Sequence, residues 1–189
     1  GALALVLDRW VINIQRKAAE ECGSSSGTVY DQAFHSVLEA FLEPLCELVH
    51  GYDFSAVLKI YAFAFAEEDM EACVVKWLRG EYRTKTEARR EFGVNACIAD
   101  DSWYDYLKLL AEFLTGAGYK GLVVMIDELV NLYKIPNSVT RQNNYEKILT
   151  MYNDTLQGKA HHLGIIMGGT PQSIEDRRRG VYSYEALRS

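Results

Sequence analysis

The hydrophobic periodicity of the chain changes at Lys120, and this change constrains the fold more than any other feature of the sequence. From Leu3 to about Gly116, apolar residues recur at intervals of three or four, which predicts amphipathic helices. After Lys120, two continuous apolar runs of strand length appear, Leu122–Ile126 and Leu163–Met167. Continuous runs of this kind are typical of parallel strands covered on both faces. The sequence therefore predicts helices followed by a parallel sheet.

Two segments follow from this division, a helical segment over 1–118 and a strand–helix–strand unit over 119–189. The helices of the first segment are expected at about 3–21, 28–49, 52–65 and 68–78, with another that Ser102 caps and Gly116 ends. A helix over about 139–156 connects the two apolar runs, as in a βαβ unit. The expected fold class is α/β, helix-rich, with a partial parallel sheet and a large helical N-terminal segment.

Composition excludes several classes of function. The chain has 20 basic and 26 acidic residues and a net charge of −6, which argues against a general electrostatic grip on nucleic acid or anionic membrane. No apolar run approaches the roughly 18 residues that a membrane-spanning helix needs. The four cysteines stand far apart without a CxxC pair, which favours reduced thiols and a cytoplasmic location.

Two acids, Asp127 and Glu128, follow the first apolar run directly. In nucleotide triphosphatases of the P-loop class, an acid at the carboxyl end of such a strand helps bind the Mg²⁺ of MgATP, and a second acid can orient the attacking water. We therefore interpret Asp127 as a ligand of Mg²⁺ and ATP and Glu128 as a catalytic residue. The alternative is that Asp127 only caps the short helix that follows.

The second apolar run ends in Gly168-Gly169-Thr170. Ligands of open α/β sheets bind outside the carboxyl ends of the strands, so Thr170 is expected at the same edge as the two acids. ATPases of this class place a γ-phosphate-sensing residue there, which makes Thr170 a candidate catalytic residue. Thr170 followed by Pro171 is also a good helix N-cap with proline at the first position, and both roles are compatible.

A run of charged residues over 175–180 includes Arg177. An arginine at this edge can stabilise charge on the transferring phosphate in the site of a neighbouring subunit, so Arg177 is the third candidate catalytic residue. The alternative is that the run is a solvated helix end, because runs of charge usually face water.

The phosphate-binding loop GxxxxGK[ST] does not occur in the sequence. Gly158-Lys159 precedes a strand, whereas a phosphate-binding loop must follow one and open a helix. The chain starts inside a helical pattern, so we expect it to be part of a longer chain that carries this loop before Gly1. On its own, the 189-residue segment is expected to be inactive as an ATPase.

Four stretches together carry a resemblance to a known family: Gly121–Leu129, Asn143–Tyr145, Gly164–Pro171 and Asp176–Gly180. They resemble the bacterial P-loop ATP-binding proteins associated with bacteriophage exclusion (BREX) defence systems, which are similar to AAA+ and initiator-type ATPases. The resemblance implies a sheet of the P-loop NTPase type, ATP and Mg²⁺ as cofactors, Asp127 and Glu128 as the Walker B pair, and Thr170 at the sensor position.

The expected function is therefore the ATP-binding and hydrolysing region of a bacterial ATPase that serves phage defence. The alternative is a non-catalytic helical interaction module whose sheet is only structural. The partners that the resemblance admits are the missing loop segment of the same chain, further copies in a homo-oligomer, and DNA or other defence-system proteins. No membrane partner is expected.

Overall fold

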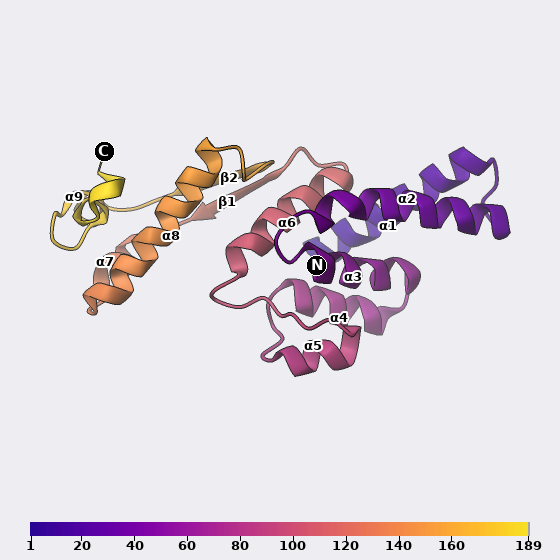
Figure 1. Ribbon diagram of the computed structural model, residues 1–189, viewed down its shortest axis with the longest axis horizontal. Helices are drawn as coiled ribbons and strands as arrows, with labels where there is room; N and C mark the ends of the chain where they lie inside the picture. Colours follow the sequence, from indigo (N-terminus) through magenta and orange to yellow (C-terminus); the bar gives the residue numbers. More distant parts are fainter. Residues whose placement is uncertain (189) are drawn as a thin grey trace. The chain divides into compact units, whose positions relative to one another are not determined.

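The structure is a computed structural model that describes residues 1–188 (Figure 1). It divides into two compact units, of which the first is Gly1–Lys120 and the second begins at Gly121. The architecture is dominated by helices and contains a parallel sheet of two strands within the described residues. The α/β, helix-rich fold class expected from the sequence is thus confirmed.

Six helices make up the first unit within its described residues. They are α1 (Ala2–Cys22), α2 (Thr28–Cys46), α3 (Gly51–Phe63), α4 (Glu68–Leu78), α5 (Lys85–Phe92) and α6 (Trp103–Gly116). Helix α1 packs against α2 and α4, and α2 packs against α3 and α6. The second helix is shorter than the predicted 28–49, because a turn begins after Cys46 in which the Leu48 N–H donates to the Leu45 carbonyl over 3.1 Å.

Aromatic rings form the centre of this helical unit. Trp10 from α1 meets Phe113 from α6 edge to face, with ring centroids 5.4 Å apart. Trp77 from α4 meets Tyr106 from α6 in the same manner over 5.5 Å, and its indole N–H donates to the Ala96 carbonyl over 3.0 Å. These rings are buried. Burial of such large side chains at helical spacing is what selects the helical state of the first 120 residues.

The second unit contains the sheet. Strands β1 (Leu122–Ile126) and β2 (Leu163–Met167) pair in parallel, with Leu122 opposite Leu163 and Ile126 opposite Met167. Between the strands lie α7 (Val130–Lys134) and α8 (Ser138–Leu156), and β2 is followed by α9 (Pro171–Glu175) and the 3-10 turns η1 (Val181–Ser183) and η2 (Glu185–Leu187). Both predicted strands and the helix between them are therefore present.

One expectation for the sheet is wrong. The apolar runs predicted strands covered on both faces, but exposure alternates along each strand. Val123, Met125 and Ile166 are 64%, 76% and 55% exposed, whereas Leu163 is buried. A strand turns successive side chains to opposite faces, so these exposed residues share one face. Within the described residues of the second unit, 121–188, no layer covers that face.

Two further observations concern membrane-spanning helices and disulfide bonds. No helix within residues 1–188 combines the length and the apolar character needed to cross a bilayer. The four cysteines, Cys22, Cys46, Cys73 and Cys97, are free thiols.

Candidate functional site

Two loops meet at the carboxyl edge of the sheet. Asp127 and Glu128 follow β1, and Gly168 to Thr170 follow β2. The Gly168 N–H donates to the Ile126 carbonyl over 2.8 Å, and the Gly168 carbonyl accepts from the Leu129 N–H over 3.0 Å. These bonds continue the parallel pairing beyond the strands and hold the loops together. The chain leaves the sheet there toward α7 and α9, which contact each other (Figure 1).

The two glycines allow the second loop to pass close to the first. A Cβ atom at position 168 would lie 3.2 Å from the Oδ1 atom of Asp127, and one at position 169 would lie 3.1 Å from the Cβ atom of Leu129. Both distances are tighter than ordinary contacts between side chains. Gly168 and Gly169 therefore bring the backbone that leads to Thr170 directly beside the Asp127 carboxylate.

Asp127 is exposed, and its Oδ1 atom accepts a hydrogen bond from the N–H of Glu128 over 2.7 Å. The residue that caps α7 is Leu129, which makes no side-chain bond to the helix. Asp127 is therefore not the N-cap that the alternative interpretation required. Its Oδ2 atom and the remaining lone pair of Oδ1 are free to accept a ligand.

Glu128 is exposed and has a positive φ of 60°. A residue other than glycine rarely adopts this conformation, which costs free energy and is concentrated at functional sites. The side chain is held in place because its Oε2 atom accepts a hydrogen bond from the Asn131 Nδ2 atom over 3.0 Å. Asn131 was missed from the sequence. The signal that could have identified Asn131 is its position three residues after the second acid, on the turn into a helix.

Thr170 caps α9, as one of its two interpretations predicted. Its Oγ1 atom accepts from the Ser173 N–H over 3.2 Å, and Pro171 occupies the first turn. The side chain is exposed. Because a hydroxyl accepts and donates, the cap leaves the Thr170 O–H free to donate. Its role in sensing phosphate remains a prediction.

Arg177 lies in the segment after α9 and not in the two loops at the sheet edge. Arg177 is exposed and lines a cavity of the second unit to which Asp127, Glu128 and Thr170 do not contribute. It lies in a turn that Asp176 organises by accepting the N–H groups of Arg178 and Arg179 over 2.7 and 3.0 Å. These two hydrogen bonds lower the pKa of Asp176 below its ordinary value, and the Tyr133 hydroxyl at 3.2 Å adds to the effect.

Comparison with known proteins assigns the chain to a family. The family model described as BREX system ATP-binding protein BrxC/D matches residues 1–189. The chain belongs to this BrxC/D family. Neither a curated protein nor a solved structure is significantly similar to it. The family model spans both units, so the helical unit is as much a part of a BrxC/D protein as the sheet and its acids.

The carboxyl edge of this BrxC/D chain suits a magnesium ion that arrives with a nucleotide. Residues 1–188 contain no group of three or more His, Cys, Asp or Glu side chains that would cage a metal by themselves. Mg²⁺ is instead commonly bound through one or two carboxylates together with substrate phosphates and water. The exposed carboxylate of Asp127 fits that donor set.

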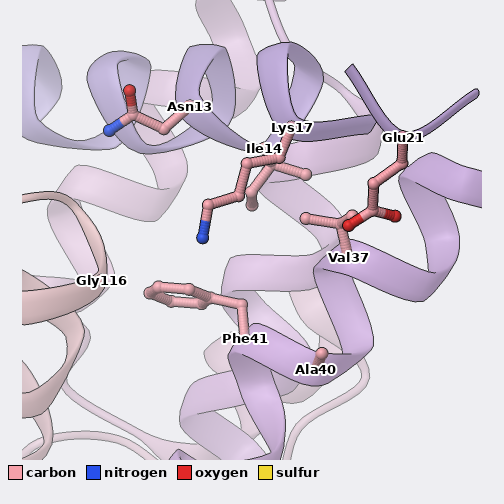
Figure 2. Close-up of a pocket in the computed structure, with 8 residues that line it drawn as sticks. All are labelled: Asn13, Ile14, Lys17, Glu21, Val37, Ala40, Phe41 and Gly116. Atoms are coloured by element: carbon pink, nitrogen blue, oxygen red, sulfur yellow. The ribbon is translucent and has the colours of Figure 1, made fainter. Parts of the chain in front are cut away.

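Two hollows lie in the helical unit of the BrxC/D chain. A cavity of about 250 Å³ lies between α1, α2 and the end of α6. Figure 2 shows the Lys17 amine extending toward the ring of Phe41 there, with Glu21 at the far end of the group. A second hollow of about 480 Å³ is mostly aromatic, with Tyr30, Phe34 and Phe63 in its wall.

Proposed function

We propose that the chain is the nucleotide-hydrolysing part of a BREX ATPase and that the carboxyl edge of β1 and β2 is its active site. The observation that carries this proposal is the arrangement of two loops at one sheet edge. Asp127 and Glu128 follow β1, and the Gly168–Thr170 loop is hydrogen-bonded beside them. Membership of the BrxC/D family supplies ATP as the nucleotide.

In this proposal Asp127 holds Mg²⁺, which neutralises charge on the phosphates when it is bound. Asp127 projects from the end of a strand whose partner is fixed in register. Its carboxylate is oriented by the Glu128 N–H at 2.7 Å, which leaves the remaining oxygen lone pairs for the metal. A single rigidly placed carboxylate is sufficient here because the phosphates and water complete the coordination shell.

Glu128 takes the role of general base for the attacking water. Its carboxylate is exposed and carries one hydrogen bond from the Asn131 Nδ2 atom, so the second oxygen is free to accept a proton from water. The positive φ turns the chain sharply between the two acids. Adjacent acids thereby serve metal and water at two separate positions around the γ-phosphate.

The remaining parts of the machinery belong to the same proposal. Thr170 donates its O–H to the γ-phosphate, and Arg177 stabilises negative charge in the site of a neighbouring copy within a homo-oligomer. The phosphate-binding loop comes from a segment of the parent chain before Gly1. The place of action is the cytoplasm, where ATP is available and the four thiols stay reduced.

The experiment compares Asp127→Asn and Glu128→Gln in a parent chain that carries the phosphate-binding loop. Asp127→Asn removes a charge from the metal shell, so nucleotide affinity and turnover should both fall. Glu128→Gln is nearly isosteric and leaves that shell intact, so ATP should bind normally while turnover falls about 10²-fold, the scale of losing a positioned base. Glu146→Gln, an exposed position on α8, is the matched control and should behave as wild type.

Steady-state ATPase rates and nucleotide affinities decide between this proposal and a helical interaction module with a structural sheet. The module predicts normal properties for both acid variants. Turnover close to wild type in either variant would contradict the role assigned to that acid. The 189-residue chain itself should show no ATPase activity above a Glu128→Gln blank.

A further inference from the structure

A small cavity of about 160 Å³ in the second unit is lined by three arginines. It lies between the first turns of α8 and the segment that follows α9. The lining residues that matter here are Arg141, Arg177, Arg178, Ser138, Ser183 and Tyr184. No acidic residue lines the cavity within residues 1–188. Guanidinium and hydroxyl groups around a hollow several times the roughly 30 Å³ of a water molecule form a setting for an oxyanion.

The arginines stand on a backbone that is held in place from several sides. Arg141 is only 8% exposed, and its Nη1 atom donates to the Ile135 carbonyl over 2.6 Å. Across the cavity, the Tyr145 hydroxyl donates to the Arg179 carbonyl over 2.6 Å. The Asp176 carboxylate fixes the same turn through the N–H groups of Arg178 and Arg179. The buried Arg141 side chain and the backbone of the turn are thus fixed, the latter in part by a bond between residues 34 positions apart in the sequence.

The protein balances the positive charge at this place only in part. Arg141, Arg177 and Arg178 take part in no ion pair within the described chain. Asp176 is the nearest acid along the turn, but its carboxylate is engaged by two N–H groups and by the Tyr133 hydroxyl. The Asp176 carboxylate attracts Arg178, but a single carboxylate cannot neutralise three guanidinium groups. Burying a cation such as Arg141 without a counter-charge is unfavourable, and a bound anion relieves this.

The start of α8 adds to the attraction. Ser138, the first residue of this 19-residue helix, lines the cavity. The side chain of Asn137 caps the helix by accepting the Thr140 N–H over 3.0 Å, and no acidic residue occurs in the first turn. The partial positive charge of a helix N-terminus therefore adds to that of the arginines.

We propose that this pocket binds a phosphate group, supplied either as free inorganic phosphate or pyrophosphate or by the phosphate chain of a nucleotide. Arginine matches phosphate because its planar fork forms paired, charge-assisted hydrogen bonds. The site consists of residues of one chain and needs neither Mg²⁺ nor the Asp127 edge. It stands even if hydrolysis at that edge is disproved, and it has Arg177 bind a phosphate within its own chain, in place of the role in a neighbouring copy.

The test is a titration of the 189-residue chain with sodium pyrophosphate, without Mg²⁺ and at constant ionic strength. Amide shifts in ¹H–¹⁵N spectra should saturate and concentrate at 138–142 and 177–184, and calorimetry gives the affinity. ATP without Mg²⁺ forms the second arm. Shifts of the same amides by ATP identify a nucleotide phosphate as a ligand, and shifts by pyrophosphate alone identify the free anion.

Two exposed arginines carry the mutational test, because their replacement leaves the buried Arg141 and the fold intact. Arg177→Gln combined with Arg178→Gln should weaken pyrophosphate binding by about tenfold or more, as expected for lost charge-assisted hydrogen bonds. Arg188→Gln removes an exposed arginine outside the pocket and should leave the affinity unchanged. Non-saturating shifts, wild-type affinity in the double variant, or an equal loss in Arg188→Gln would each overturn the proposal.

Discussion

The side-chain amide of Asn131 holds the carboxylate of Glu128, with 3.0 Å between Nδ2 and Oε2. The two residues are also joined through the backbone, since the Asn131 N–H donates to the Glu128 carbonyl over 2.8 Å. This pair closes the turn that starts at the strained φ of Glu128. Asn131 is thus a positioning residue for the proposed base, because it touches the carboxylate and leaves one oxygen for water.

Replacing Asn131 with alanine should lower the ATPase turnover of the parent chain about tenfold, the usual consequence of losing one hydrogen bond to a charged group. Nucleotide affinity should not change, because Asn131 is placed to touch only the base. In a Glu128→Gln background the same replacement should have little further effect. Asn144→Ala is the control, since the Asn144 amide bonds only the Thr140 carbonyl on α8. Additive losses in the double variant would contradict the positioning role.

Thr170 carries two roles that one substitution can separate. Aspartate caps helices at least as well as threonine, so Thr170→Asp should keep α9 and the protected Ser173 N–H. It also places a negative charge where the proposal puts the γ-phosphate, so ATPase turnover should fall at least about tenfold. Thr170→Ser preserves both functions and serves as the control. Normal turnover of Thr170→Asp in steady-state assays would leave Thr170 as a cap only.

Local periodicity explains what was predictable. Helices α1 to α4, α6 and both strands were predicted because each has a recognisable pattern of apolar residues within a few turns or a single run. Helix α5 was not predicted in this way, because its short sequence is dominated by charged residues. The edge of the sheet at which the candidate residues lie was also predictable. Asp127 and Gly168 come directly after the two apolar runs, so parallel strands place both residues at the carboxyl edge. Proximity of Asp127 and Gly168 could therefore be anticipated from the sequence, whereas their catalytic use stays a prediction.

Contacts distant in sequence explain what was not predictable. Arginine is normally exposed, and nothing near Arg141 indicates that it is buried beneath the turn 176–180. That burial depends on bonds such as Tyr145 to Arg179, 34 residues apart. The exposed face at Met125 also depends on more than the local sequence. The apolar composition of β1 suits a strand that is covered on both faces. Whether its side chains are exposed depends on whether other elements of the described chain pack on each face of the sheet.

The turn around Asp176 should respond to pH in a defined direction. The folded-state pKa is lowered, so the stabilisation of the turn is fully present above the ordinary value of 3.8 and is lost as the pH falls through the lower folded value. The N–H signals of Arg178 and Arg179 should therefore shift with an apparent midpoint below 3.8. In Asp176→Asn, which keeps an acceptor oxygen but does not titrate, these shifts should vanish. A midpoint at or above 3.8 would show that the carboxylate does not accept the two bonds.

Packing in the helical unit can be tested at Gly116, the last residue of α6. A Cβ atom there would overlap the ring of Phe41 at its Cε2 atom and could be accommodated only by moving the ring (Figure 2). Gly116→Ala should therefore destabilise the unit by about 2 kcal/mol, as overpacking of a filled site does. Urea unfolding followed by tryptophan fluorescence measures the change, because the tryptophans of this unit include Trp10, whose ring lies 5.4 Å from Phe41.

A double variant shows whether the ring of Phe41 is the cause of that loss. In Phe41→Ala the space beside Gly116 opens, so adding Gly116→Ala should cost far less than it does alone, and the two changes should be clearly non-additive. Gly164→Ala is the matched control in β2, because its Cβ would meet only the Cγ2 atom of Val123 at 3.7 Å, and it should alter stability by no more than about 0.5 kcal/mol. If Gly116→Ala costs the same with and without the Phe41 ring, its effect comes from the backbone of α6 and not from the contact between α2 and α6.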